Sequence, residues 1–296
     1  MGGVSHEREI SLKTGRAILG ALQEEGYDAV RIDVSFDIVQ KLLSTAIDVA
    51  FIALHGRWGE DGTVQGLLEL LRIPYTGSGV LASALAMNKI KSKEMFLYHG
   101  VPTPEFMVAL PEEPLEVPFP TPWVVKPASE GSTVGISIVR EPSDLDDAVS
   151  RARQYDQQVL IEQFIRGREL TVGILHGEPL PIVEIVPQGG FYDYRAKYTP
   201  GITEYLIPAR IEDRTGETAQ RLSLQAYRAL TCSGCARVDL LLDEGGDIFI
   251  TEVNTLPGMT ETSLVPKAAA HKGLSFRQLV LSILEDASLK VEGGGQ

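Results

Sequence analysis

Residues 236–254, ARVDLLLDEGGDIFITEVN, constrain the fold of this chain more than any other stretch. Two runs rich in apolar residues flank the pair Gly245-Gly246, and glycine supplies the positive φ angles that a two-residue hairpin turn needs. The pattern predicts two antiparallel strands with these opposed pairs: Glu244 and Asp247, Asp239 and Glu252, Arg237 and Asn254. One face of the hairpin is then apolar and belongs to a core: Val238, Leu240, Leu242, Phe249 and Val253.

The other face of this predicted hairpin gathers Arg237, Asp239, Glu252 and Asn254 at its open end. An Asp and a Glu directly opposite each other repel. A hard cation between them removes that repulsion, and two carboxylates with an amide oxygen are ligands that Mg²⁺ takes together with phosphate oxygens. Taken alone, two acids and an arginine favour a solvated sheet face, so the metal site depends on the rest of the chain.

The composition is that of an ordinary globular protein, with 44% hydrophobic and 23% charged residues in a chain of 296. At roughly 100–200 residues per domain, two or three domains are expected. The formal net charge of −13 argues against nucleic acid or an anionic membrane as the main partner. No stretch approaches the roughly 18 apolar residues of a membrane span, and no signal-peptide pattern is visible, so we expect a cytoplasmic protein.

Two cysteines, Cys232 and Cys235, are spaced as CSGC. Such a pair can be a redox site or half of a zinc site. The chain has no second pair, so the sequence favours two small buried residues that lead into the hairpin.

The start of the chain suits a ligand, because Gly2 and Gly3 precede a predicted helix and allow a close backbone approach. A glycine turn of this kind normally follows a buried strand, and Met1 stands where that strand would end. We therefore expect either a fold that does without the strand or a translation start upstream. Residues 48–54, DVAFIAL, predict a buried parallel strand that ends at His55, the end where α/β sheets place ligands.

The middle of the chain combines a lysine-bearing helix with a loop that suits phosphate. The helix is expected over residues 81–98 and carries Lys89, Lys91 and Lys93. Such lysines usually form a solvated face, although one could reach a phosphate. Strands at 123–126 and 136–139 flank the loop PASEGSTVG, which predicts a phosphate-covering hairpin because no GK[ST] motif opens a helix. Lys126 lies at its mouth.

The second half of the chain becomes antiparallel, with strands expected at 169–175 and 180–186. The long loop at 187–203 contains FYDYRAKYTPG, and loops of that length in compact domains are functional lids or disordered segments. Its aromatic and basic residues favour a lid. A helix over 212–230 then leads into the hairpin.

Seven segments have a family-specific order and spacing: GGVSHEREISL, FIALHGRWGEDG, PYTGSG, VVKPASEGSTVG, FYDYRAKY, ARVD and EVNTLPGMTETSLVP. Because of these seven segments, nearly the whole chain resembles the D-alanine-D-alanine ligases of the ATP-grasp superfamily. The resemblance implies an α/β chain with an α+β C-terminal part. Its three domains are an N-terminal doubly wound substrate domain that lacks its first strand (1–78), a central ATP-grasp domain (79–162) and a C-terminal catalytic domain (163–290). Residues 291–296 are expected to be a disordered tail.

The resemblance further implies ATP-dependent joining of two D-alanines through an acyl phosphate for peptidoglycan precursors, with Mg²⁺ or Mn²⁺, in a homodimer. It assigns the nucleotide to Lys89, Lys126, Glu162, Gln163, Ile165, Glu169 and Lys197. It assigns the first D-alanine to Glu7, His55, Ser132 and Tyr198. The oxyanion is assigned to Arg237 and the backbone N–H of Gly258, and the second D-alanine's carboxylate to Ser263 and Leu264. The metal is assigned to Asp239, Glu252 and Asn254, which the hairpin register also groups.

Two alternatives stay open. One is an ATP-grasp ligase with D-lactate or D-serine as its second substrate; in the resemblance, the Lys197-Tyr198 pattern on the lid favours an amine nucleophile instead. The other is a nucleotide-binding homologue without turnover, whose first-substrate site is broken by the missing strand. The intact metal-binding set and Arg237 argue against that homologue.

Overall fold

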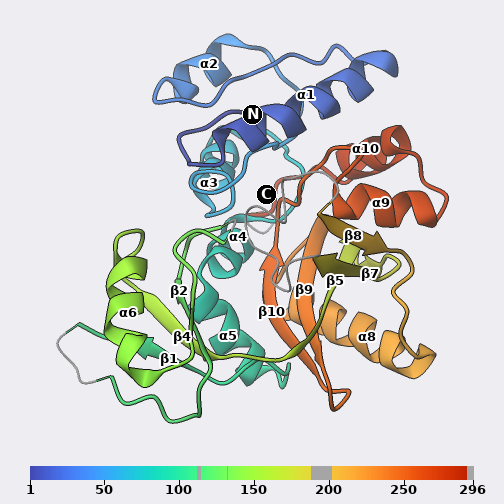
Figure 1. Cartoon of the computed structure of the whole chain (residues 1–296). Coiled ribbons are helices and arrows are strands. Elements are labelled where there is room, and N and C mark those ends of the chain that lie inside the picture. Colours follow the sequence, from blue (N-terminus) through green and yellow to red (C-terminus); the bar gives the residue numbers. More distant parts are fainter. Residues whose placement is uncertain (112–114, 132, 188–201, 292–296) are drawn as a thin grey trace.

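The computed structural model describes residues 1–111, 115–131, 133–187 and 202–291 (Figure 1). Two antiparallel sheets lie side by side below an N-terminal part that is built mainly of helices and connecting segments (Figure 1). The mixture of helices with antiparallel sheets agrees with the ATP-grasp architecture expected from the sequence.

The N-terminal part contains α1 (Arg8–Glu24), α2 (Ile38–Ser44) and α3 (Thr63–Leu70). The expected strand at 48–54 is represented by one parallel bridge, between Ala50 and Tyr75. The bridge is parallel, as predicted, but residues 48–54 do not form a continuous strand. Residues 52–55 are nevertheless buried, and Tyr75 is fully buried in the core of this part. His55, which follows this apolar run, is therefore held in a buried position even without a continuous strand.

The first sheet has the strand order β1-β4-β2-β3. Its strands are β1 (Phe106–Ala109), β2 (Trp123–Pro127), β3 (Ser137–Val139) and β4 (Val159–Gln163). A 3₁₀ turn at Pro142–Asp144 leads into α6 (Leu145–Arg153), which packs on one face of the sheet. The predicted strand–loop–strand unit is confirmed, because β2 and β3 pair antiparallel around the Gly/Ser/Thr loop.

The second sheet has the order β10-β9-β5-β7-β8, with β6 paired to β5. Its strands are β5 (Gly167–Leu175), β6 (Glu178–Pro179), β7 (Val183–Pro187), β8 (Thr203–Leu206), β9 (Cys235–Asp243) and β10 (Ile248–Asn254). The helix α8 (Asp213–Ala229) packs against this sheet (Figure 1). Two helices, α9 (Leu264–His271) and α10 (Phe276–Glu285), follow β10.

The β9–β10 hairpin differs from its prediction near the turn. Its loop is longer than two residues: the N–H of Asp243 donates to the carbonyl of Asp247, and the N–H of Gly246 donates to the carbonyl of Asp243. The pairing there is shifted by one residue, and the shift is recovered between Ile250 and Glu252. As a result Phe249 leaves the core face, which instead takes Ile248 and Ile250. The predicted opposed pairs at the open end are confirmed.

The helix expected over residues 81–98 is two helices, α4 (Val80–Met87) and α5 (Lys89–Tyr98). They separate at Asn88, whose backbone is extended with ψ 103° and whose side chain accepts hydrogen bonds from the N–H groups of Ile90 and Lys91. Asparagine is a favoured N-cap because its side-chain oxygen satisfies N–H groups of the first turn. This local bonding outweighs the helical continuity suggested by the apolar spacing.

Candidate functional site

The open end of the β9–β10 hairpin brings four polar side chains to one face. Asp239 pairs with Glu252, Arg237 pairs with Asn254, and all four residues are partly buried. Alternation along each strand puts these side chains opposite Val238 and Val253, which point into the core. The grouping predicted from the register is therefore confirmed.

Asp239 is the centre of this group. The guanidinium of Arg237 donates two hydrogen bonds to it, from Nε to Oδ1 at 2.8 Å and from Nη2 to Oδ2 at 2.7 Å. The Thr171 hydroxyl donates to Oδ1 at 2.6 Å, and the Asn254 amide donates to Oδ2 at 3.2 Å. A bidentate carboxylate fixes the plane of a guanidinium, so Asp239 orients Arg237 over the end of the sheet.

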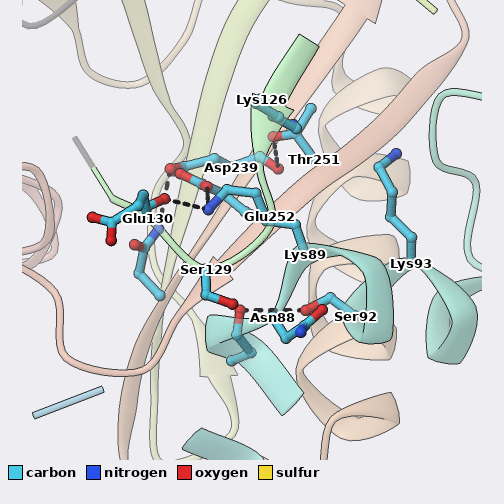
Figure 2. A network of polar contacts seen from close by, with 12 residues as sticks. Asn88, Lys89, Ser92, Lys93, Lys126, Ser129, Glu130, Asp239, Thr251 and Glu252 are labelled. Atoms are coloured by element: carbon cyan, nitrogen blue, oxygen red, sulfur yellow. Dashed lines mark hydrogen bonds and ion pairs between the residues drawn. The ribbon is translucent and has the colours of Figure 1, made fainter. Parts of the chain in front are cut away.

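Lys89 connects this hairpin to the loop at residues 127–135 between β2 and β3, the predicted phosphate-covering loop (Figure 2). It is the first residue of α5, and its side chain is almost fully buried. Its ammonium donates to the Glu130 carbonyl at 2.7 Å and lies 3.8 Å from a carboxylate oxygen of Glu252. Its backbone N–H donates to the Ala128 carbonyl at 2.9 Å. The break at Asn88 thus places a cation between the loop and the acidic end of the hairpin.

A second cationic group lies on the first sheet, where Lys126 and Lys93 share the carboxylate of Glu162. Lys126 Nζ is 2.5 Å from Oε1, and Lys93 Nζ is 3.0 Å from Oε2. All three residues are buried. Burial alone raises the pKa of Glu162, but the adjacent ammonium groups of Lys126 and Lys93 outweigh it and hold that pKa below its usual range. Glu162 therefore carries a full negative charge.

The burial of Lys93 was missed by sequence reasoning, which treated the lysines of this helix as a mainly solvated face. Lys89 and Lys93 are buried, and only Lys91 is exposed, where it pairs with Glu94. The available signal was the four-residue spacing of Lys89 and Lys93, which places two side chains on one face of a helix.

Glu7 lies against the phosphate-covering loop although it belongs to the N-terminal part. A methyl group added to Gly131 would come within 2.9 Å of Glu7 Oε2, and one added to Gly56 would come within 3.0 Å of the same atom. The carboxylate therefore fits between two glycines from segments far apart in the sequence. The structure brings Glu7 to the junction of the N-terminal part and the loop.

His55 is buried beside Glu7's helix and is held from several sides. Its backbone N–H donates to Ser11 Oγ at 2.9 Å, and its ring Nε2 lies 3.1 Å from Thr14 Oγ1. Its Nδ1 is 3.8 Å from Glu60, whose other oxygen accepts the N–H of Gly56 at 2.8 Å. A cavity of about 20 Å³ next to the ring extends to the loop after β10.

The loop after β10 carries Gly258, whose neighbours Pro257 and Met259 line this cavity, and ends at Ser263, the N-cap of α9. Ser263 Oγ accepts the N–H of Thr260 at 3.1 Å and is 2.9 Å from the Thr260 hydroxyl. Ser263 precedes Leu264, the first residue of α9, so both stand at a helix N-terminus, where free N–H groups favour an anion. A methyl group on Gly258 would lie 3.2 Å from Ser263 Oγ.

Comparisons with known proteins agree on one family. A family model described as "D-ala D-ala ligase C-terminus" matches residues 100–285, and one described as "D-ala D-ala ligase N-terminus" matches residues 36–78. A D-alanine--D-alanine ligase of Syntrophotalea carbinolica is 54% identical over 98% of this chain and 95% of its own length. That of Geobacter sulfurreducens is 52% identical over 100% of this chain and 95% of its own length.

The chain belongs to the D-alanine-D-alanine ligase family. A crystal structure of the D-alanine--D-alanine ligase from Bacillus anthracis complexed with ATP superposes with a TM-score of 0.86 at 37% identity, covering 97% of this chain and 94% of that one. The family and the ATP-grasp fold expected from the sequence are thereby confirmed.

The remaining residues expected at a D-alanine-D-alanine ligase nucleotide site follow Glu162. Gln163 ends β4, where its N–H donates to the Glu105 carbonyl at 2.8 Å, and Ile165 is partly buried in the connection to β5. Glu169 lies on β5 opposite Leu241 of β9. The first two lie next to the buried Glu162 network, while Glu169 belongs to the second sheet. Ser132, Lys197 and Tyr198, the other site residues expected from the family, lie outside the described residues.

The residue types at the hairpin end match a magnesium ion, which would replace some of the four hydrogen bonds that the Asp239 carboxylate accepts here. Two opposed carboxylates, Asp239 and Glu252, and the amide of Asn254 match its preference for hard oxygen ligands. In the described part of the chain no group of three or more His, Cys, Asp or Glu side chains could hold a metal. A metal here would therefore need the amide oxygen and oxygens from a bound nucleotide. The described residues also contain no helix that is long and apolar enough to cross a membrane.

Proposed function

We propose that this protein joins two D-alanines to D-alanyl-D-alanine at the cost of one ATP, in the cytoplasm and for peptidoglycan precursors. The observation that carries the proposal is the meeting of Lys89 with the Asp239–Glu252 end of the hairpin and the phosphate-covering loop. Bringing a carboxylate to a triphosphate gathers anions, and this arrangement supplies cations and metal ligands at one place.

Binding of substrates is divided among the three parts of the chain that the sequence delimits, residues 1–78, 79–162 and 163–290. Lys89 and Lys126 would contact the phosphates, and Gln163, Ile165 and Glu169 would hold the adenosine part. Glu7 and His55 would bind the first D-alanine, with Ser132 and Tyr198. Ser263 and Leu264 at the start of α9 would bind the carboxylate of the second D-alanine. Lys197 would be a further contact to the phosphates of ATP.

The reaction has two steps. A carboxylate oxygen of the first D-alanine attacks the γ-phosphorus, its P–O bond forms, and the bond to the β-phosphate oxygen breaks to release ADP. The amine of the second D-alanine then attacks the acyl carbon, loses a proton and expels phosphate. Arg237, oriented by Asp239, and the N–H of Gly258 would stabilise the oxyanion of the second step. Mg²⁺ or Mn²⁺, held by Asp239, Glu252 and Asn254, would neutralise phosphate charge.

The test measures phosphate release from ATP and Mg²⁺ with D-alanine, D-lactate or D-serine, alone and in pairs, and identifies products by mass. We expect release with D-alanine alone and the mass of the dipeptide. A product formed only with D-lactate or D-serine as partner would assign another second substrate. ATP binding without release for any substrate would support the non-catalytic alternative.

Assembly as a homodimer is part of the proposal. Phe36 and Leu43, in and next to α2, expose 88% and 70% of their surfaces, and a partner subunit would cover such apolar groups. Analytical ultracentrifugation should give twice the chain mass of 32.2 kDa. A single species at the chain mass at micromolar concentration would contradict the dimer.

A further inference from the structure

The shared carboxylate of Glu162 joins a lysine expected to contact nucleotide with one that cannot reach it. Lys126 is 6% exposed and Lys93 is completely buried. Lys93 Nζ donates to Thr103 Oγ1 at 2.6 Å and to the Pro104 carbonyl at 3.1 Å, and it lies 3.0 Å from Glu162 Oε2. The Lys93 ammonium is therefore surrounded by three oxygen atoms of the protein: two accept hydrogen bonds from it, and the third forms an ion pair with it.

The charges of this group add up to one net positive charge. Glu162 contributes a carboxylate, and Lys93 and Lys126 contribute two ammonium groups. If Lys93 were absent, Lys126 and Glu162 would form a neutral buried pair. A buried carboxylate that loses its counter-ion pays a large desolvation cost, so Glu162 would then retain the ammonium of Lys126.

We propose that Lys93 is a positioning residue for the nucleotide: it is the resident counter-ion of Glu162, which leaves the charge of Lys126 available to the phosphates of ATP. This inference rests on the proposed function for the role of Lys126. It assigns Lys93 no contact with substrate. Its effect passes through Glu162 and Lys126 to the strength of nucleotide binding.

The surroundings of Lys93 support its role as the counter-ion of Glu162, and they restrict that role to the pH range in which Lys93 is charged. The ring of Phe106 lies 5.1 Å from its ammonium, and the charged groups facing it are Glu162 and Lys126. Burial lowers the pKa of Lys93 to about 8, although Glu162 acts in the opposite direction. Lys93 is thus mostly charged at neutral pH and loses its charge under alkaline conditions, where the group becomes neutral overall.

The test compares ATP dissociation constants, measured by calorimetry with Mg²⁺, for wild type, Lys93→Met, Glu162→Gln, the double variant Lys93→Met/Glu162→Gln and the control Lys91→Met. Lys91 lies on the same helix but is exposed and pairs with Glu94. We expect Lys93→Met to weaken ATP binding at least tenfold, and Lys91→Met to change it less than twofold. Without the carboxylate, Lys93 has no negative charge to neutralise and its loss should matter little, so the double variant should bind ATP within threefold of Glu162→Gln.

Two results would overturn the inference. One is a Lys93→Met protein that binds ATP within twofold of wild type. The other is a folded double variant that binds ATP at least tenfold more weakly than Glu162→Gln, because loss of a merely structural lysine would weaken binding equally with or without the carboxylate. If Lys93→Met does not fold, the ATP dissociation constants of wild type and the double variant are measured from pH 7 to pH 9. Wild-type binding should weaken at least fivefold over this range, and binding by the double variant should not. A wild-type dissociation constant that does not change with pH refutes the inference. Wild type that binds no ATP would instead refute the proposed function.

Discussion

The contact between Glu7 and the phosphate-covering loop can be perturbed without touching either charge. In Gly131→Ala, the new methyl group would lie 2.9 Å from Glu7 Oε2, whereas ordinary contacts begin at 3.4 Å. The Glu7 carboxylate must therefore retreat by about 0.5 Å. Since a displacement of about 1 Å at a reacting centre costs on the order of 100-fold in rate, half of it predicts about a tenfold loss in kcat/KM for D-alanine.

The fold should tolerate this substitution. Gly131 does not use a positive φ angle, and the atom in its way is the end of a flexible side chain. We expect the free energy of unfolding to change by less than about 1 kcal/mol. The matched control is Gly20→Ala in α1, where nothing lies within 4 Å of the new methyl group. That variant should be about 0.5–1 kcal/mol more stable, with unchanged kinetics.

The assay is phosphate release at saturating ATP over a range of D-alanine concentrations, with KM for ATP measured separately. Gly131→Ala should raise KM or lower kcat for D-alanine and leave KM for ATP within about twofold. Unchanged D-alanine kinetics in a folded Gly131→Ala protein would refute the placement of Glu7 in the first-substrate site. A loss confined to ATP would assign this contact to the nucleotide instead.

Three further predictions concern the hairpin, α5 and the cysteines. Asp239→Asn should lower kcat at least about 100-fold and raise the Mg²⁺ concentration needed for half-maximal rate, because it removes both a metal ligand and the anchor of Arg237; a fully active variant would exclude this role. Asn88→Ala should lower the free energy of unfolding by about 1 kcal/mol through loss of the α5 cap, measured by denaturant titration, and no change would show that the cap is not needed. Cys235 is buried and Cys232 is partly buried, and desolvation raises both thiol pKa values to about 12. Iodoacetamide at pH 7.5 should therefore leave the native mass unchanged and label both cysteines after unfolding; rapid native labelling of either would contradict these raised pKa values.

The hairpin shows how far sequence reasoning reaches. Strict alternation and the need to hide Val238 and Val253 fix which residues share a face, so the grouping of Asp239 with Glu252 was predictable. The shift near the turn was not. The register changes at Thr251, whose hydroxyl donates to the Asp239 carbonyl at 3.0 Å. A single side-chain bond to the backbone leaves no periodic signal.

The lysines of α5 show where sequence reasoning stops. Apolar spacing predicted one helix through Asn88, and no pattern revealed that the side chain of this residue caps a new helix. The four-residue spacing places Lys89 and Lys93 on one face of the helix, but it does not show that this face is buried; that requires knowing that β4 brings Glu162 against Lys93. The motifs were sufficient to predict the family, whereas the counter-ions of buried groups required the tertiary structure.

The geometry of α5 joins these observations, because this helix supplies a cation to an acid on each sheet. Lys89 lies 3.8 Å from Glu252 on β10 of the second sheet, and Lys93 lies 3.0 Å from Glu162 on β4 of the first. Residues four apart on a helix differ by about one turn, so a rotation or shift of α5 moves both cations together. The polar end of the β9–β10 hairpin and the buried Glu162 network are therefore connected through one short helix, whose start is set by Asn88.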